Sequence, residues 1–346
     1  MDKLDPSAVR TYAETYLGLY RDALGSDLAA KGLNALLSDS IEAGAQNWTP
    51  ALIDEFRRPR GYDPVPWFPA LTGTVVESAE RTDRFLWDYR RTISELLTQS
   101  HHTVLAAVAR EHGLKYYPEA LEGHRLQLGD DLAMRAAADV PMGAIWTTPR
   151  GQKPRQTFGA DLQGAASVAH VHGKPLVAAE TIHGIWGPLG FPPSDLKPGM
   201  SLAPLLGQYF SRNETWGDMA AGWTDYLARS SFLLQQGRPV ADIAYFAGEE
   251  APITGLYGET PVDVPSGRGF DFIDLGTLLE GTSVDADGVM VTKGGARYPL
   301  LVLGGSSRFM TFATLHRIRG LVDQGAAVVG SQPVGSPSLG DEKEAF

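Results

Sequence analysis

The chain has 346 residues, of which 43% are hydrophobic and 21% charged, so it can bury the core of one large globular domain or of two ordinary ones. Its formal net charge of −11 argues against nucleic acid as a partner, and its lack of cysteine excludes disulfides, thiolate catalysis and cysteine-ligated zinc. With this charge a neutral or weakly charged substrate suits the chain better. No apolar run reaches the roughly 18 residues of a membrane-spanning helix, so no membrane partner is expected.

The first half of the chain alternates predicted helices with short apolar strands. A helix starts at Asp5-Pro6 and stops near Gly25. The residues predicted to share one side of it are Val9, Tyr12, Tyr16, Leu17 and Tyr20. Further helices are predicted at 49–56, 78–112 and 160–172, strands at 33–37, 115–117, 141–146 and 176–179, and a rigid proline-rich connection at 59–69. This alternation, at a spacing of about 40 residues or less, favours parallel βα units over a sandwich.

The second half begins with a loop-like stretch, residues 184–200, and an amphipathic helix at 213–234. The residues of that helix expected in the core are Trp223, Tyr226, Leu227 and Phe232. A second α/β section follows Gly237, with strands predicted at 241–246, 270–273, 299–303 and 326–329 and helices at 275–279 and 312–322. We therefore predict two domains, residues 1–237 and 238–346, and a frayed tail at 336–343.

Two glutamates stand where predicted apolar strands run out. Glu42 follows residues 32–41, and Glu180 closes residues 174–179. In a TIM-type β/α barrel the carboxyl ends of the strands form the mouth where the chemistry occurs, so both acids are expected there. Such a pair is the minimum for cleaving a glycosidic bond, because one carboxyl group donates a proton and the other activates water or attacks.

Side chains suited to a sugar surround Glu42 in the sequence. Trp48 offers an aromatic face and Asn47 an amide, which together provide stacking and directed hydrogen bonds. Asp39 is predicted to bind a sugar hydroxyl or to tune the pKa of Glu42. The alternative is that Asp39 caps a helical turn and that Glu42 assists it.

Glu180 has candidate neighbours of its own. His183 and Trp186 lie close enough along the chain to line the same pocket, although a lone histidine is more often structural. Glu119, after the strand 115–117, is a third acid at a strand end. It is predicted either to ligate calcium or hold a sugar hydroxyl, or to be an ordinary loop carboxylate.

Five motifs follow one another along the chain: residues 37–49 (LSDSIEAGAQNWT), 85–90 (FLWDYR), 174–180 (KPLVAAE), 209–216 (YFSRNETW) and 237–246 (GRPVADIAYF). Together they resemble glycoside hydrolase family 106, the α-L-rhamnosidases. The resemblance implies a barrel enzyme that removes terminal L-rhamnose with inversion, usually with calcium near the sugar hydroxyls. It also implies that Glu42 and Glu180 are the catalytic pair, that a flavodoxin-like domain follows the barrel, and that members are usually periplasmic or secreted. The sequence does not fix which glutamate is the acid and which is the base; we favour Glu42 as the acid and Glu180 as the base.

Two departures from the family accompany this resemblance. Family members are several times longer, so we expect the chain to be an internal piece, and Met1–Asp5 lacks the basic start and apolar stretch of a signal peptide. Between Glu180 and residue 199 the family has room for a further strand, where this chain has only a loop. Four strands cannot close a barrel, so we expect weak activity from the chain alone and self-association through its open edges.

Two other functions stay open at this stage. One is a retaining barrel glycosidase of the β-galactosidase kind, with its two acids about 5–5.5 Å apart instead of the roughly 6.5–9.5 Å of an inverting enzyme. The other is a catalytically inactive carbohydrate-binding or assembly module.

Overall fold

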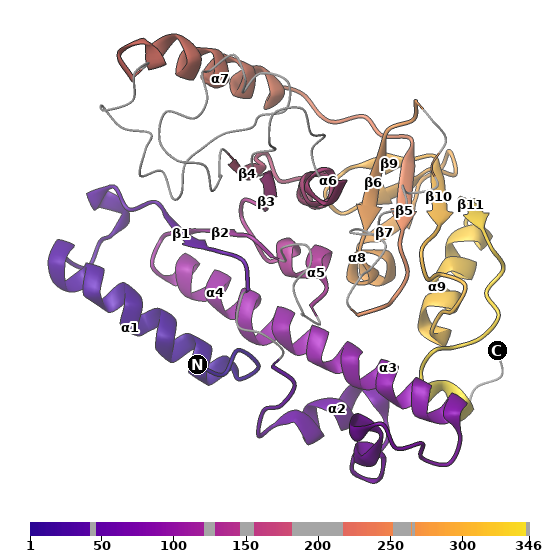
Figure 1. Ribbon diagram of the computed structural model, residues 1–346. Coiled ribbons are helices and arrows are strands. Elements are labelled where there is room, and N and C mark those ends of the chain that lie inside the picture. The colour runs from indigo at the N-terminus through magenta and orange to yellow at the C-terminus, as the bar shows by residue number, and fades with distance from the viewer. Residues whose placement is uncertain are drawn as a thin grey trace.

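A long helical rod organises the molecule in the computed structural model, which describes residues 1–41, 46–120, 129–145, 156–181, 217–251, 264 and 267–343 (Figure 1). The rod consists of α3 (Ala79–Leu96), a π-helical turn at Leu97–His102 and α4 (Thr103–Glu111). Ser78 caps its start, where its side chain accepts the N–H of Arg81 at 3.2 Å. The predicted helical stretch at 78–112 is therefore confirmed.

Helix α1 (Pro6–Leu24) packs beside α4 (Figure 1). Asp5 caps it, accepting the N–H of Ser7 at 2.8 Å, and Gly25 ends it with a φ of 94°. The predicted face is confirmed in part: Val9 and Leu17 are buried together with Ala13, and Tyr20 is partly buried against the same core, but Tyr12 and Tyr16 are not buried. Tyr12 and Tyr16 are 56% and 40% exposed: residues spaced by four form a second stripe beside the apolar one, and the aromatic rings contact one another there.

Four short strands form two parallel pairs. β1 (Ala35–Ser38) pairs with β2 (Lys115–Pro118), and β3 (Met142–Ile145) pairs with β4 (Ala178–Thr181). Of these strands, β2 packs against α4 of the rod. The carbonyl of Tyr116 accepts the N–H groups of Asp139 and Val140, at 2.9 and 3.2 Å, which joins the second strand to the segment that leads into the third. The parallel pairing predicted for this half of the chain is confirmed, although the strand ends differ by a few residues, so that Glu180 lies inside β4.

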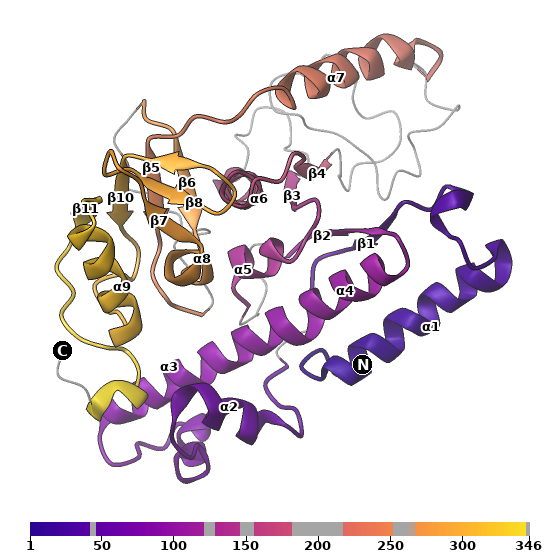
Figure 2. The same cartoon turned by 180° about the vertical axis from the view of Figure 1, so that it is seen from behind.

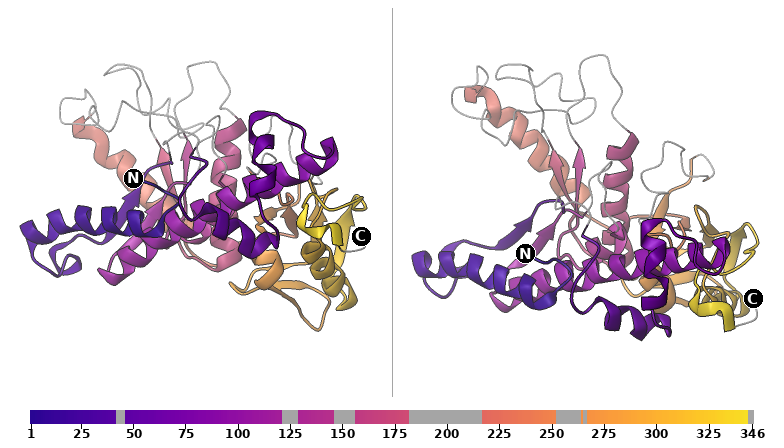
Figure 3. Two further views of the ribbon diagram at one scale, coloured as in Figure 1. Left: turned by 90° about the horizontal axis from the view of Figure 1, so that it is seen from below. Right: turned by 60° about the horizontal axis from the view of Figure 1, so that its bottom comes forward.

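Two helices connect these strands and cover them. They are α5 (Asp131–Ala136), which Asp130 caps, and α6 (Gln156–His172). Helix α6 lies between the first four strands and the C-terminal sheet (Figures 1 and 3). Its Ser167 hydroxyl accepts the N–H of Phe272 at 2.9 Å, and His170 Nδ1 lies 2.8 Å from the carboxylate of Asp271. The two parts of the chain therefore share one continuous packed region.

The C-terminal part is built on a parallel sheet with the strand order β11-β10-β5-β6. The strands are β5 (Ile243–Phe246), β6 (Phe270–Ile273), β10 (Leu300–Leu303) and β11 (Ala327–Gly330), and the helices are α8 (Leu275–Glu280) and α9 (Phe312–Asp323). All six elements match sequence predictions to within two residues. A small antiparallel sheet was not predicted; its strands are β7 (Thr282–Val284), β8 (Met290–Thr292) and β9 (Arg297–Tyr298).

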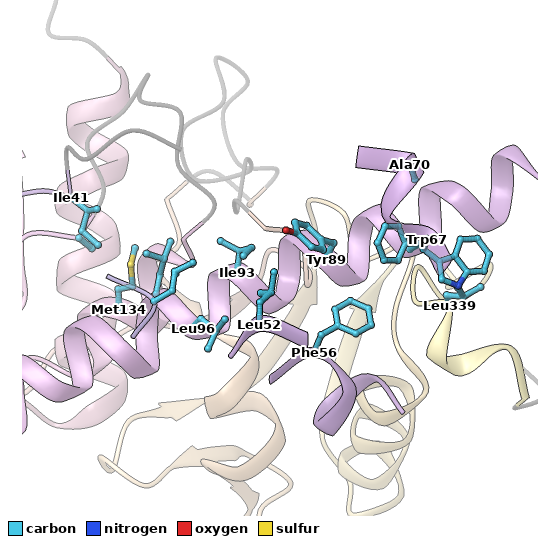
Figure 4. Packing of buried hydrophobic residues seen from close by; sticks show 14 residues of the cluster. Ile41, Leu52, Phe56, Trp67, Ala70, Tyr89, Ile93, Leu96, Met134 and Leu339 are labelled. Atoms are coloured by element: carbon cyan, nitrogen blue, oxygen red, sulfur yellow. The ribbon is translucent and has the colours of Figure 1, made fainter. Parts of the chain in front are cut away.

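A core of aromatic and aliphatic side chains fastens the lower end of the rod (Figure 4). Helix α2 (Leu52–Arg60) supplies Phe56, and a 3₁₀ helix at Val65–Thr72 supplies Trp67, so the proline-rich stretch forms an element after all. Leu339 joins the same core at 6% exposure. The prediction of a frayed tail at 336–343 is therefore wrong, because this segment is held by burial and includes a 3₁₀ turn, Gly340–Lys343.

Helix α7 (Ala220–Leu234) stands away from these packed parts (Figures 1 and 2). It has no buried residue, and Tyr226 and Phe232 are 47% and 63% exposed. Its predicted contribution to a core is wrong for the described part of the chain. None of the helices that the structure describes has the length and apolar character needed to cross a membrane.

Candidate functional site

Three carboxylates converge at the carboxyl ends of the paired strands. Asp39 directly follows β1, Glu119 directly follows β2, and Glu180 is the third residue of β4. One carboxylate oxygen from each lies within 4.8 Å of the others. The acids come from two separate two-stranded sheets, β1-β2 and β3-β4, whose carboxyl ends meet here and bring together residues 141 positions apart in sequence.

Backbone pairing beyond the strand ends holds two of these acids in place. The N–H of Glu119 donates to the carbonyl of Ser38 at 2.9 Å, and the N–H of Ile41 donates to the carbonyl of Ala120 at 3.3 Å. The Asp39 carboxylate also accepts the N–H of Ser40 at 2.8 Å. The two chain segments therefore stay side by side where their acids project.

The three acids differ in their exposure. Glu119 is only 4% exposed, Glu180 is partly buried, and Asp39 is exposed. Among the described residues, Oε1 of Glu119 has no hydrogen-bond partner. The cluster is therefore buried at Glu119 and open to solvent or a ligand at Asp39.

Burial and like charge act together on Glu119. Its pKa is raised to about 9, and the largest cause is the removal of the carboxyl group from water. The charge of the Glu180 carboxylate, a hydrogen bond with Glu180, and the charges of Asp39 and Asp161 also raise it. At neutral pH the cluster therefore holds a proton, unless a cation takes the place of that proton. This is the behaviour of a metal site or of an acid–base site.

A buried ion-pair network lies behind the carboxylates. Arg135 on α5 is fully buried and binds Asp161 on α6, and its Nη2 lies 3.1 Å from Oδ1 of Asp131. This network was not predicted from the sequence. A signal was available, because a single arginine and a single aspartate stand among alanine, glycine and other apolar residues in two adjacent helices.

The predicted sugar-binding residues Asn47 and Trp48 are placed at the surface. Trp48 meets the ring of Phe68 edge-on, with ring centroids 5.8 Å apart, and the backbone carbonyl of Asn47 accepts the hydroxyl of Tyr89 at 2.6 Å. These contacts fix the segment beside α3, and sugar binding by its side chains stays a prediction.

Three predicted site residues lie outside the described residues: Glu42, His183 and Trp186. The alternative in which Asp39 caps a turn depends on Glu42 and therefore also lies outside them in part. The structure thus brings together Asp39, Glu119 and Glu180 from the predicted set.

Carboxylates gathered at the ends of parallel strands that are joined by helices define a class, the α/β enzymes that work at the carboxyl edge of their strands. The family is more specific: the chain belongs to glycoside hydrolase family 106, described as alpha-L-rhamnosidase, whose model matches residues 1–198 and 190–346.

Known proteins similar to this chain include both sequence and structural relatives. A putative beta-glucuronidase of Formosa agariphila is 34% identical over 365 aligned positions, which cover 98% of this chain and 30% of the relative. A rhamnosidase from Novosphingobium sp. PP1Y is 48% identical with a TM-score of 0.93, over 99% of this chain and 35% of that protein. A cold-adapted beta-galactosidase from Rahnella sp. R3 shares the fold at a TM-score of 0.52 and 13% identity, over 93% of this chain and 56% of that one.

The chain thus spans about a third of the length of its two nearer relatives named here. Its motif segments 37–49 and 174–180, which contain Asp39 and Glu180, lie inside the region that the family model matches.

Proposed function

We propose that the chain carries the active-site acids of a glycoside hydrolase that removes terminal α-L-rhamnose from a plant or microbial glycan or glycoside. The observation that carries the proposal is the convergence of Asp39, Glu119 and Glu180 at the strand ends of a family 106 chain. In this proposal residues 1–237 form part of a TIM-type β/α barrel, and residues 238–346 form a flavodoxin-like domain. The parallel order β11-β10-β5-β6 supports the second assignment.

The reaction that we propose inverts the anomeric configuration. Glu42 acts as the general acid that protonates the glycosidic oxygen, and Glu180 acts as the base that removes a proton from the attacking water. Such a pair needs its carboxyl groups about 6.5–9.5 Å apart so that the water fits beneath the anomeric carbon. Asp39, Asn47, Trp48, His183 and Trp186 would bind the sugar.

The described acids fit the calcium ion that the family resemblance implies. Calcium takes several hard oxygen ligands, and Asp39, Glu119 and Glu180 offer carboxylate oxygens within 4.8 Å of one another. Among the described residues the buried Oε1 of Glu119 has no hydrogen-bond partner, which adds a reason, since a buried carboxylate oxygen needs a proton or a cation. Glu119, with Asp39 beside it, would hold the ion while Glu180 keeps its role as the base, and a bound ion would offset the negative charge of the cluster and coordinate sugar hydroxyls.

A retaining mechanism is the second candidate, and one observation favours it. Glu119 and Glu180 approach more closely than an inverting pair, and the raised pKa of Glu119 suits a general acid. Glu180 would then be the nucleophile; since a retaining pair has its carboxyl groups about 5–5.5 Å apart, the hydrogen bond between Glu119 and Glu180 would have to open when the sugar binds. The fold shared with a beta-galactosidase is compatible with this candidate.

Hydrolysis of nitrophenyl α-L-rhamnopyranoside tests both candidates. For the inverting enzyme we expect Glu42→Gln and Glu180→Gln each to lower kcat by about 10²–10⁴-fold. NMR of the first-formed sugar should show β-L-rhamnose. The control is Glu111→Gln, which changes an exposed acid that pairs with Arg10 on the outer surface of α4 and should keep wild-type kcat.

The outcomes separate the candidates. First-formed α-L-rhamnose, with loss of activity in Glu119→Gln and not in Glu42→Gln, would select the retaining mechanism. Absence of turnover together with retained binding of rhamnose would select the inactive carbohydrate-binding module, and absence of both would reject the proposal.

A further inference from the structure

At one edge of β3 the carboxylate of Asp161 accepts a backbone N–H group, as a neighbouring strand would. Among the described strands β3 pairs with β4 alone, and its residue Ala144 stands opposite Glu180 in the parallel register. The N–H of Ala144 donates to Oδ2 of Asp161. A side chain from α6 therefore satisfies the backbone of the residue that pairs with Glu180.

Arg135 holds that aspartate from the other side. Its Nη1 donates to the backbone carbonyl of Asp161 at 2.6 Å, and its Nη2 donates to Oδ1 of the same residue. The guanidinium is fully buried, and Asp161 is 6% exposed. A two-point contact of this kind fixes both the position and the rotation of the carboxylate, and it offsets the charge of that carboxylate inside the protein.

Two glycines leave the space that this network fills. A Cβ at Gly143 would lie 3.0 Å from the carbonyl oxygen of Asp161 and 3.1 Å from its Oδ2. A Cβ at Gly164 would lie 2.9 Å from Nη1 of Arg135 and 3.2 Å from Oδ2 of Asp131. Neither glycine has a left-handed backbone, so close approach and not conformation is the reason for glycine at both positions.

We infer that Asp161 is a positioning residue of the active site, which acts through Ala144 to set the place of Glu180 and is itself set by Arg135. This inference rests on the proposed function in that it gives Glu180 a catalytic role. The physical reason is that β3 and β4 are only four residues long, so few bonds fix their relative position. Loss of the bond at Ala144 would let β3, and Glu180 with it, shift against Glu119.

The test compares Asp161→Asn and Gly143→Ala with the wild type. The asparagine has one acceptor oxygen where the carboxylate uses two, and the alanine keeps every charge but pushes β3 away from Asp161. We expect each variant to lower kcat about 10–100-fold with KM changed less than about 3-fold, since misplacement of a catalytic group by about 1 Å costs such factors. Circular dichroism and a single unfolding transition should remain as in the wild type.

A matched control is Asp88→Asn, which changes another fully buried carboxylate that sits in a hydrogen-bond network but touches neither β3 nor β4. It should lower the midpoint of thermal unfolding and leave kcat per folded molecule unchanged. Wild-type kcat in both Asp161→Asn and Gly143→Ala, or a loss no greater than that of the control, would overturn the inference.

Two measurements without substrate separate this inference from the proposed function. Amide hydrogen exchange should become at least about 10-fold faster at Ala144 in Asp161→Asn. Crystal structures should show that Glu180 in both variants is displaced relative to Glu119 from its wild-type position. If the wild type does not act on a rhamnoside but both changes appear, the proposed function fails and the positioning role stands; if neither appears, the positioning role fails.

Discussion

Among single residues of the site, Glu119 combines burial, neighbouring negative charge and a raised pKa. It is 4% exposed, close to two other carboxylates, and its pKa is raised to about 9 from an ordinary value of 4.5. Between these two values the folded protein holds a proton that the unfolded chain has released. The free energy of unfolding should therefore fall as pH rises from about 4.5 toward 9.

We predict that Glu119→Gln removes much of this slope. In calcium-free buffer the wild type should lose on the order of 2 kcal/mol more than the variant between pH 5 and pH 9, which corresponds to about 3 °C in the unfolding midpoint of a chain of this length. Thermal denaturation followed by circular dichroism at a series of pH values measures the difference. Added calcium should restore the midpoint of the wild type at pH 8 and have no effect on the variant.

The control for this experiment is Glu280→Gln, an exposed acid at the end of α8, which should follow the wild-type curve. Parallel curves for the wild type and Glu119→Gln would contradict the raised pKa. A calcium response in Glu119→Gln equal to that of the wild type would contradict the assignment of Glu119 as a ligand.

At the scale of elements, the C-terminal segment is fastened to helix α3 by one buried carboxylate. Asp88 accepts the hydroxyl of Ser338 at 2.7 Å, the N–H of Leu339 at 2.9 Å and the hydroxyl of Tyr62 at 2.8 Å. Nε of Arg60 lies 4.0 Å away. Burial raises the pKa of Asp88, while these donors and the guanidinium lower it in part.

We predict that Asp88→Ala destabilises the protein by about 2–4 kcal/mol, because three buried donors lose their acceptor and Leu339 loses its anchor in the core. Denaturant unfolding measures this loss. Limited proteolysis should then cut near residues 336–340 in the variant. Asp83→Ala on the same helix changes an exposed aspartate and should stay within about 0.5 kcal/mol of the wild type. Equal stability of the two variants would show that the segment is held by Leu339 alone.

The elements that sequence could predict are those in which periodicity and chemistry agree. Glu119 and Glu180 were found because an acid at the end of an apolar strand contradicts its surroundings. The buried side of α1 was predicted only in part, because Tyr12 and Tyr16 follow the same helical spacing as Val9 and Leu17 and nothing local says which of the two stripes faces inward. Asp161 and the C-terminal segment depend on contacts with residues far away in sequence, which no local pattern contains.

At the scale of the whole molecule, a large apolar surface remains exposed. The last turn of α7 carries Phe232, Leu233 and Leu234 at 63%, 68% and 86% exposure, and within the described ranges β1 and β4 each pair with one other strand. Contiguous apolar side chains and unpaired strand edges both favour association with another chain. Self-association of this chain is therefore our expectation, and α7 is the element from which we expect it to start.

We predict that sedimentation velocity shows a concentration-dependent rise in mass for the wild type between about 1 and 100 μM, a range in which exposed apolar surface of this kind drives association. Phe232→Glu combined with Leu234→Glu should shift the chain toward the monomer, since burial of two carboxylates in an apolar contact is costly. Ala228→Glu, which adds a charge at an exposed small residue of the same helix, should have a much weaker effect. A wild type that stays monomeric across the range would contradict the prediction, and association unchanged in the double variant would move the contact from α7 to the strand edges.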